Sequence, residues 1–215
     1  MKSTFSKEQA IKIIKNAAER YDNSLNNKDL LIITKEGKRI ENYILQFQDS
    51  NFMHFTGVQS NFSPSKFFHA VLQGELSIND FDFKDNFLAE KKMRILEKAV
   101  DLPLSARMIG NFNYAGIKLQ ADIGAGSPSF VMAFRYDDRN KLYPVSVLEE
   151  DIRNCTQPTS PVFAILRKNM TEKMFREMTY LSKTINKNNI FIPKDYDKII
   201  TPDVLRQLRG YEERI

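Results

Sequence analysis

Apolar side chains recur at helical spacing near the start of the chain. In "SKEQAIKIIKNAAERY", Ser6 and Gln9 stand in the order of a helix-capping box, and the apolar residues that follow return every three or four positions: Ala10, Ile14, Ala17 and Tyr21. This pattern predicts a first helix. The next stretch, "DLLIITKEGKRIENYILQFQ", has two apolar runs on either side of Glu36 and Gly37, which predicts a β-hairpin.

Two further helices are predicted in the middle of the chain. Ser63 can cap the first of them, Pro64 suits its first position and Gly74 suits its exit. The second helix is predicted over "DNFLAEKKMRILEKAVDLP" and stops before Pro103. Its apolar positions recur at helical spacing, at Leu88, Met93, Leu96 and Val100.

After Pro103 the apolar period changes to two, which is typical of strands with one buried face. The alternating positions are Ile117, Leu119, Ala121 and Ile123, and then Phe130, Met132, Phe134 and Tyr136. "GAGSPS" between them is predicted to be a flexible connector, because no helix follows it to hold a phosphate. "KLYPVSVL", with Pro144 at an edge or a bulge, and "PVFAILRK" complete a predicted antiparallel meander.

The C-terminal part returns to helical spacing. Thr171 can cap a helix over "TEKMFREMTYLSKTIN", whose apolar stripe consists of Met174, Met178, Leu181 and Ile185. The order of elements predicts an α+β fold with N-terminal helices packed on a four-stranded antiparallel β-meander, and with C-terminal helices. We expect one domain over residues 1–215, with a helix and hairpin in 1–48, a central core in 49–170 and a helical extension in 171–215.

Composition narrows the classes of function. The 215 residues, 42% of them apolar, lack both the roughly 18 consecutive apolar residues of a membrane helix and a secretory signal, so we expect a soluble cytoplasmic protein without a membrane partner. One cysteine, Cys155, and two histidines argue against a disulfide and a zinc site, and we expect neither metal nor cofactor. The net charge is +5, and residues 163–215 hold 11 Lys and Arg against 7 Asp and Glu. This excess suits a polyanionic partner or a solvated basic surface.

His54 is the first candidate for chemistry, because it stands in the short apolar run "NFMHFTGV". An imidazole gives or takes a proton near neutral pH, and apolar neighbours would hold the ring in one orientation. On an extended backbone the hydroxyl group of Thr56 would point the same way as the His54 ring. The alternative is a core histidine that bonds a backbone carbonyl, and His69, on a predicted helix, is expected to be structural.

The segments "NFMHFTGV", "IGNF", "YPVSVL" and "VFAILRK" follow an N-terminal helix in this order. Together they resemble a phage-associated family, the fourth phage group, of the barnase, EndoU, colicin and RelE-like ribonuclease superfamily. The resemblance covers roughly residues 40–170. It implies N-terminal helices against a four-stranded antiparallel sheet, and a metal-independent endoribonuclease of phage or mobile-element origin.

The reaction implied by this resemblance is attack of the RNA 2'-hydroxyl group on the adjacent phosphate, which needs a base, an acid and cations. By the resemblance, His54 is the base or the acid, and Thr56 positions the phosphate. Lys168 and Arg167, at the end of the last strand, would stabilise the charged intermediate. The second proton-transfer group stays open, with Asp122 and Arg135 as candidates. Further candidates for contact with substrate are Tyr143, Ser146 and Arg135.

Three functions therefore compete. The first is a cytoplasmic endoribonuclease, a toxin or a phage tool that acts on host RNA and could have an antitoxin or immunity protein as its partner. The second is a non-catalytic phage protein on the same fold, which binds RNA or a host protein through its basic C-terminal helices. The third docks on a partner through the methionine stripe of residues 174–178, although such a stripe is more often part of a core.

Overall fold

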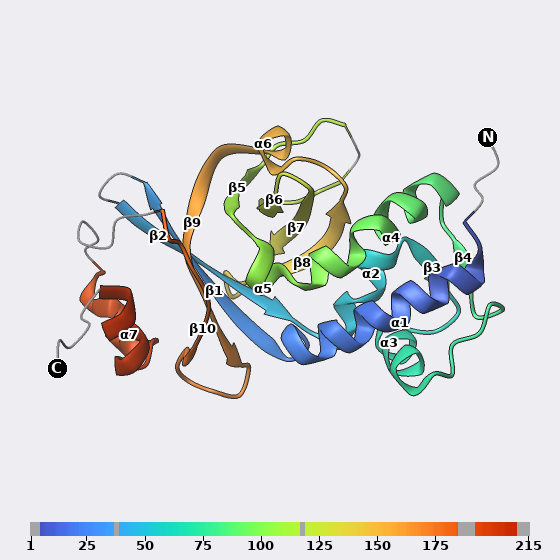
Figure 1. Ribbon diagram of the computed structural model, residues 1–215, viewed down its shortest axis with the longest axis horizontal. Coiled ribbons are helices and arrows are strands. Elements are labelled where there is room, and N and C mark those ends of the chain that lie inside the picture. The colour runs from blue at the N-terminus through green and yellow to red at the C-terminus, as the bar shows by residue number, and fades with distance from the viewer. Residues whose placement is uncertain (1–4, 37–38, 117–118, 185–191, 210–215) are drawn as a thin grey trace.

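The computed structural model describes residues 5–36, 39–116, 119–184 and 192–209 (Figure 1). It has a mixed α+β fold. The helices are α1 (Lys7–Ser24), α2 (Met53–Thr56), α3 (Pro64–Gln73), α4 (Asn86–Val100), α5 (Leu102–Ser105), α6 (Ile152–Cys155) and α7 (Pro202–Arg209), with 3-10 helices η1 (Asp49–Asn51) and η3 (Lys194–Lys198). The strands are β1 (Lys28–Glu36), β2 (Arg39–Phe47), β3 (Val58–Ser60), β4 (Phe81–Phe83), β5 (Met108–Phe112), β6 (Ile123–Ser127), β7 (Phe130–Tyr136), β8 (Leu142–Leu148), β9 (Thr156–Asn169) and β10 (Glu177–Leu181).

The N-terminal helices form where the sequence predicts them. At the start of α1, the Gln9 backbone N–H donates to Ser6 Oγ and the Ser6 N–H donates to Gln9 Oε1, which completes the capping box. Ser63 caps α3, which ends at Gly74 in the left-handed conformation. The buried face of α1 packs against α4 and α3, and Figure 1 shows α1 and α4 running side by side. This helical part holds the segment that contains His54.

Seven strands close into a barrel in the described part of the chain. They pair in the order β1, β2, β8, β7, β6, β5 and β9, and β9 pairs back with β1. The pairs are antiparallel except β2 with β8, which is a parallel contact between Leu45 and Leu142. The 14 residues of β9 are long enough to pair with β5 through its first half and with β1 and β10 through its second. The predicted β-hairpin of β1 and β2 is confirmed.

The prediction of a four-stranded meander is wrong. Strands β6, β7 and β8 follow one another as predicted, but β8 then pairs with β2, and the last predicted strand lies in β9 beside β5. "GAGS", predicted as a connector, belongs to β6, which pairs with β5 and β7. Gly126 allows the close approach of β7, because a Cβ there would lie 2.2 Å from the Phe130 carbonyl oxygen. Residues 117 and 118 lie outside the described part, and Leu119 and Ala121 are not in a strand.

The predicted helix that begins at Thr171 is also wrong. Residues 177–181 form β10, which pairs with the part of β9 that β5 leaves free. A register shift between Met178 and Tyr180 turns Met178 toward the C-terminal cluster and Tyr180 toward the main core. Tertiary pairing therefore overrides a helical spacing of apolar residues. The remaining C-terminal helical structure is η3 and α7.

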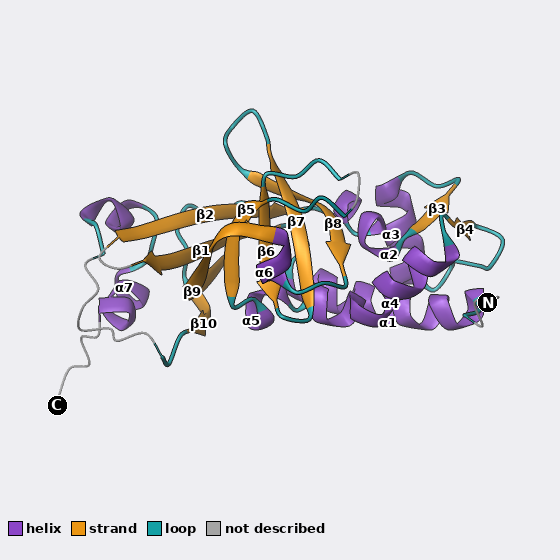
Figure 2. Cartoon of the chain, turned by 90° about the horizontal axis from the view of Figure 1, so that it is seen from above, coloured by secondary structure: helices purple, strands orange, loops and turns teal. Residues whose placement is uncertain are grey.

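Strand β1 is buried on both faces, which explains its continuous apolar run. Leu30 and Ile32 contribute to the main core, which fills the barrel and extends under α1, α3 and α4. Leu31 and Ile33 contribute to a second cluster that packs against η3 and α7. Figure 2 shows the result, with α1 to α4 and the strands β3 and β4 at one end, the strands of the barrel in the middle and α7 at the other end.

Candidate functional site

Residues 48–56 form a short helical connection that several hydrogen bonds hold against the N-terminal helices. The Tyr21 hydroxyl group donates to the Gln48 carbonyl oxygen (2.7 Å), and the Gln48 backbone N–H donates to Asn51 Oδ1 (2.8 Å). Asp49 Oδ2 accepts a hydrogen bond from the hydroxyl group of Ser65 on α3 and lies 3.1 Å from His69 Nε2. His54 follows in α2, where its side chain is exposed. These contacts therefore fix the backbone that carries His54 against α1 and α3.

Thr56 and Gly57 shape the end of α2. The expectation of an extended backbone here is wrong: because α2 is a helical turn, the side chains of His54 and Thr56 do not point the same way. Thr56 is fully buried, and its Oγ1 donates to the Met53 carbonyl oxygen (2.8 Å). Gly57 has a φ of 74°, and a Cβ there would lie 2.9 Å from the Ala89 Cα. The Thr-Gly pair thus ends α2 and allows its close contact with α4.

Lys92 lies on the buried face of α4, directly beneath α2. It is only 7% exposed. Its Nζ donates to the His54 carbonyl oxygen (2.8 Å) and to Ser146 Oγ on β8 (3.0 Å). Within the described residues, Lys92 forms no ion pair with a carboxylate. Lys92 therefore connects α4 to α2 and β8, and its charged ammonium group bonds only to uncharged oxygen atoms.

The charges that act on His54 are positive. Partial burial lowers the pKa of His54, and the charges of Lys84 and Lys92 lower it further. Burial lowers the pKa of Lys92 from 10.5 to about 8, and the charge of Lys84 also lowers it. Lys84 is exposed, and its backbone N–H donates to the Gly57 carbonyl oxygen (3.2 Å). His54 is therefore neutral at pH 7 and can accept a proton, while two lysines supply positive charge around it.

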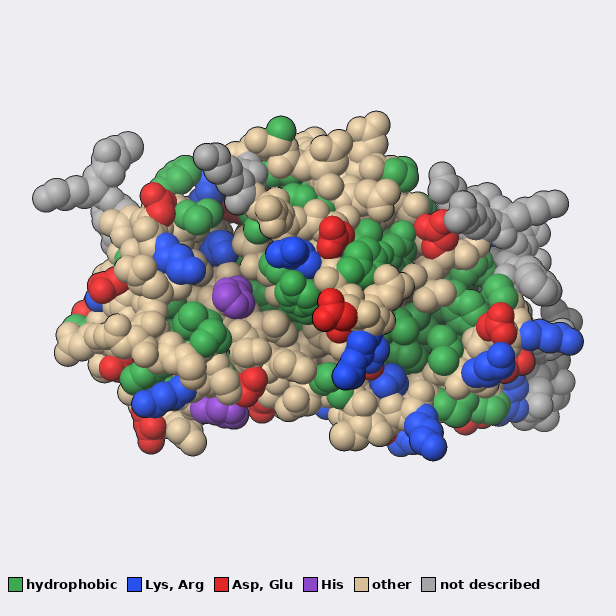
Figure 3. Space-filling model, turned by 180° about the vertical axis from the view of Figure 1, so that it is seen from behind, with side chains coloured by type: hydrophobic (Ala, Val, Ile, Leu, Met, Phe, Trp, Pro, Cys, Tyr) green, Lys and Arg blue, Asp and Glu red, His purple; other side chains and the backbone are tan. Residues whose placement is uncertain are grey.

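His54 lines a pocket of about 200 Å³ between the connection and the barrel. Its other lining residues come from η1, from the start of α3 and from β8: Ser50, Asn51, Pro64, Tyr143, Pro144 and Val145. We call this the His54 pocket. On the face shown in Figure 3, histidine side chains reach the surface, with lysine, arginine and acidic side chains around them. His54 and Lys84 are both exposed. This arrangement suits an anionic ligand with a group that can give a proton to the His54 imidazole.

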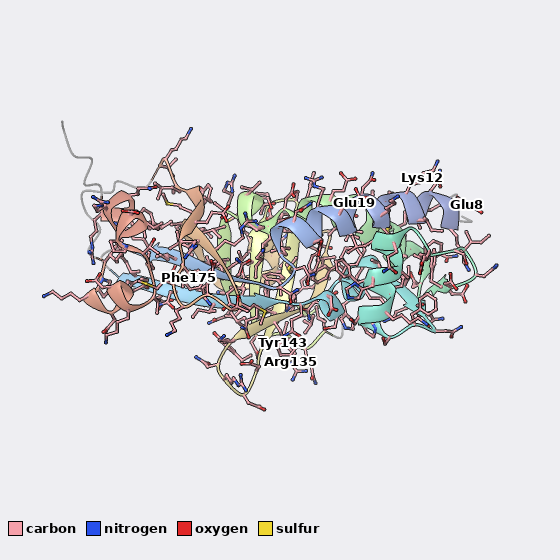
Figure 4. The ribbon with its side chains drawn as sticks, turned by 90° about the horizontal axis from the view of Figure 1, so that it is seen from below. Glu8, Lys12, Glu19, Arg135, Tyr143 and Phe175 are labelled. Carbon is pink, nitrogen blue, oxygen red and sulfur yellow. The ribbon has the colours of Figure 1, made fainter. Side chains whose placement is uncertain are left out.

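Strands β7 and β8 place two of the predicted substrate contacts near the pocket. Tyr143 lines it directly and stands opposite Arg135 in the strand register, and Figure 4 shows the two side by side. Arg135 is exposed and lines a second pocket of about 480 Å³ that also includes Asp122. Ser146 is buried, with its hydroxyl group bonded to Lys92. Pro144 lies at a register shift in β8, as predicted.

The sequence of residues 13–198 matches the family described as "phage-Barnase-EndoU-ColicinE5/D-RelE like nuclease4". The chain belongs to this family. Comparisons with curated proteins and with solved structures found no match. The matched range includes the His54 segment, α4 and every strand of the barrel, so the family that the sequence motifs indicate is confirmed.

Lys168 and Arg167, which are predicted for the active site of this phage nuclease-like chain, contact acidic residues outside the His54 pocket. Lys168 Nζ is 3.0 Å from Asp29 Oδ2 and donates to the Glu172 carbonyl oxygen (2.7 Å). Arg167 forms an ion pair with Glu177 on β10. Neither residue lines the His54 pocket. His69, expected to be structural, contacts Asp49 as described above.

Sequence reasoning missed Lys92 and Lys84 in this member of the phage nuclease family. A signal for Lys92 was present, because it lies three residues after Ala89 and four before Leu96, in the middle of the apolar stripe of α4. A lysine on such a stripe must either bend its ammonium group out to water or reach a polar partner inside. Lys84 has no comparable signal, because an exposed lysine before a helix is ordinary.

Other groups that could carry chemistry lie apart from the His54 pocket. Cys155 is buried, and burial raises the pKa of its thiol to about 11. Across residues 5–36, 39–116, 119–184 and 192–209, no three His, Cys, Asp or Glu side chains gather as ligands for a metal ion. No helix in the same ranges is long and apolar enough to cross a membrane.

Proposed function

We propose that this member of the phage nuclease family is an endoribonuclease that cleaves RNA by attack of a 2'-hydroxyl group, with His54 as the general base. The observation that carries the proposal is the electrostatic setting of His54. Its side chain lines a pocket, partial burial lowers its pKa, and the charges of Lys84 and Lys92 lower the pKa further. A phosphodiester group bound at this site would supply the negative charge that the surroundings of His54 lack.

In the proposed reaction the neutral His54 ring takes the proton of the 2'-hydroxyl group. The 2'-oxygen forms a bond to phosphorus, and the bond from phosphorus to the 5'-oxygen breaks. The departing 5'-oxygen takes its proton from water, and the product strand ends in a 2',3'-cyclic phosphate. Positive charge from Lys84, and from Lys92 through the interior, favours the negative charge that builds on the phosphoryl oxygens.

Lys92 acts in this proposal as a positioning residue. Its hydrogen bond to the His54 carbonyl oxygen fixes the backbone of α2, and its charge adds to the effects of burial and of Lys84, which lower the pKa of His54. Tyr143 and Arg135 stay candidates for contact with the RNA strand beside the pocket. The hydroxyl groups of Thr56 and Ser146 are both engaged by the protein, so we assign them structural roles.

The deciding experiment uses total RNA, the wild-type chain and His54→Ala, with and without EDTA, followed by mapping of the new RNA ends. We expect the wild type to cut with EDTA present and to leave cyclic phosphate ends, because the proposed steps use only side chains. His54→Ala should lose about a hundredfold or more of the cleavage rate, which is the size of effect that general-base catalysis supports.

His69→Gln is the matched control, because it removes the other histidine, which lies on α3 outside the His54 pocket, and keeps a hydrogen-bond donor for Asp49. It should keep the cleavage rate within a few-fold. Thermal melting of each variant checks that the fold persists. RNA that stays intact with the wild type, or equal rates for His54→Ala and the wild type, would contradict the proposal and leave RNA binding without cleavage as the alternative.

A further inference from the structure

The His54 pocket has the size and the lining of a site for one small planar group. Its lining includes an aromatic residue and two prolines: Tyr143 and Pro144 on β8 and Pro64 at the start of α3. Its volume of about 200 Å³ is below the roughly 300–1,000 Å³ of pockets for drug-sized ligands. Proteins that read RNA sequence take unpaired bases out of the strand and stack them on aromatic side chains. A single unpaired base suits this pocket.

Asn51 supplies the polar edge of the pocket in a fixed orientation. The Gln48 backbone N–H, which can only donate, lies 2.8 Å from Asn51 Oδ1. This bond shows which amide atom of Asn51 is the oxygen and which is the nitrogen, an assignment that is usually ambiguous for an asparagine side chain. The Nδ2 group, with its two N–H donors, has no hydrogen-bond partner among the described residues, and Asn51 lines the pocket, so we infer that Nδ2 donates to a ligand there.

We propose that the His54 pocket binds the unpaired base next to the bond that is cut, and that Asn51 selects uracil and guanine, the bases with a keto oxygen at C4 or C6 respectively. The proposal rests on the proposed function, because the cut bond is the one that His54 serves. Uracil and guanine present a carbonyl oxygen that can accept a hydrogen bond from Asn51 Nδ2. Cytosine and adenine present an amino group at the corresponding position, where two donors would face each other.

Asn51→Asp tests this selection with little change to the fold. The aspartate keeps an oxygen for the Gln48 N–H but replaces the two donors by an acceptor. Four single-stranded oligonucleotides, identical except for U, G, C or A at the base beside one cleavable bond, are compared by kcat/KM. We expect the wild type to favour U and G over C and A by about three- to tenfold, since one hydrogen bond decides the choice, and Asn51→Asp to reverse the order.

Asn154→Asp is the matched control, because it makes the same change of charge on α6, away from the pocket. It should leave the order of the four oligonucleotides as in the wild type. A second variant, Tyr143→Ala, should weaken binding of all four by about tenfold, since stacking does not depend on the base. This variant keeps the proposal testable even if Asn51→Asp proves unstable. If Tyr143→Ala and the wild type bound the oligonucleotides with equal affinity, the proposal that the pocket binds a base would be overturned.

Failure of this proposal can be told apart from failure of the proposed function. If the wild type cuts RNA but Asn51→Asp keeps the wild-type order, the base site is overturned while the nuclease stands. If the wild type cuts none of the four, their uncleavable 2'-O-methyl versions are compared by binding instead. A preference for U and G that Asn51→Asp reverses would still support the base site, and an unchanged order would overturn it.

Discussion

Lys92 and Lys168 are two largely buried lysines, and their surroundings differ in one respect. Lys168, whose side chain is 11% exposed, lies 3.0 Å from the buried carboxylate of Asp29. Lys92, 7% exposed, meets the carbonyl oxygen of His54 and the hydroxyl group of Ser146. One lysine therefore has an opposite charge beside it, and the other has only neutral partners.

The carboxylate of Asp29 also joins other strands. Asp29 is 2% exposed, accepts a hydrogen bond from Gln46 on β2 (2.9 Å) and lies 3.8 Å from Lys141 Nζ, next to β8. Lys168 thus takes part in a charge network across the barrel, close to the parallel contact of β2 with β8. The comparison teaches that a balanced buried charge holds strands together, whereas an unbalanced one marks a place where an anionic ligand can be received.

The largest expected difference between the two lysines is in stability. Lys168→Met should lower the free energy of unfolding by roughly 3 kcal/mol at pH 7, because it leaves the Asp29 carboxylate buried with weaker partners. Lys92→Met should instead raise it by about 1 kcal/mol, because removal of a buried unpaired charge outweighs the loss of two hydrogen bonds. Urea unfolding of both variants beside the wild type measures the difference.

The pH dependence of stability checks whether the buried charge of Lys92 lowers the free energy of unfolding. Its pKa is about 8 in the folded chain and near 10.5 in the unfolded chain, so between these values the unfolded chain binds more protons. Stability of the wild type should therefore rise with pH from about 8 to 10.5, relative to Lys92→Met, and show no such difference below pH 8. A Lys92→Met variant less stable than the wild type at pH 7 would contradict the account of an unbalanced charge.

A second expected difference is in the pH profile of RNA cleavage. The rate should fall below pH 6.5 as the His54 ring gains a proton, and it should fall again above pH 8 as Lys92 loses its charge. Above pH 8 the rate should fall to a lower plateau, because Lys92 positions His54 and does not itself transfer a proton. Lys92→Met should be slower and should lack this alkaline fall, while an Asp29→Asn and Lys168→Met double variant should keep it. An alkaline fall that persists in Lys92→Met would assign it to another group.

The fold was predictable where local signals and tertiary contacts agree. The cap at Ser6, the cap at Ser63 and the exit at Gly74 each depend on neighbouring residues, and α1 and α3 formed as predicted. The helix expected from Thr171 failed because the free edge of β9, which is remote in sequence, pairs with this segment. The meander failed for the same reason, since the pairing of β8 with β2 joins distant parts of the chain.

The candidate site was predictable in part. The apolar surroundings of His54 and its family motif indicated the histidine, but not the helical turn that separates it from Thr56. Lys168 was chosen for its place at a strand end, and only the structure brings Asp29 beside it. Lys92 could have been found from its place on an apolar stripe, whereas its contact with His54 depends on how α4 packs on α2.

The most direct test of the central claim is the titration of the His54 ring by proton NMR, with and without an uncleavable 2'-O-methyl oligonucleotide. The chain has two histidines, so His69→Gln assigns the two sets of ring signals. The account predicts a midpoint below pH 6.5 for free His54, and a clear upward shift when the bound phosphodiester supplies the missing negative charge. A midpoint at or above 6.5 in the free chain, or one that the bound oligonucleotide leaves unmoved, would contradict it.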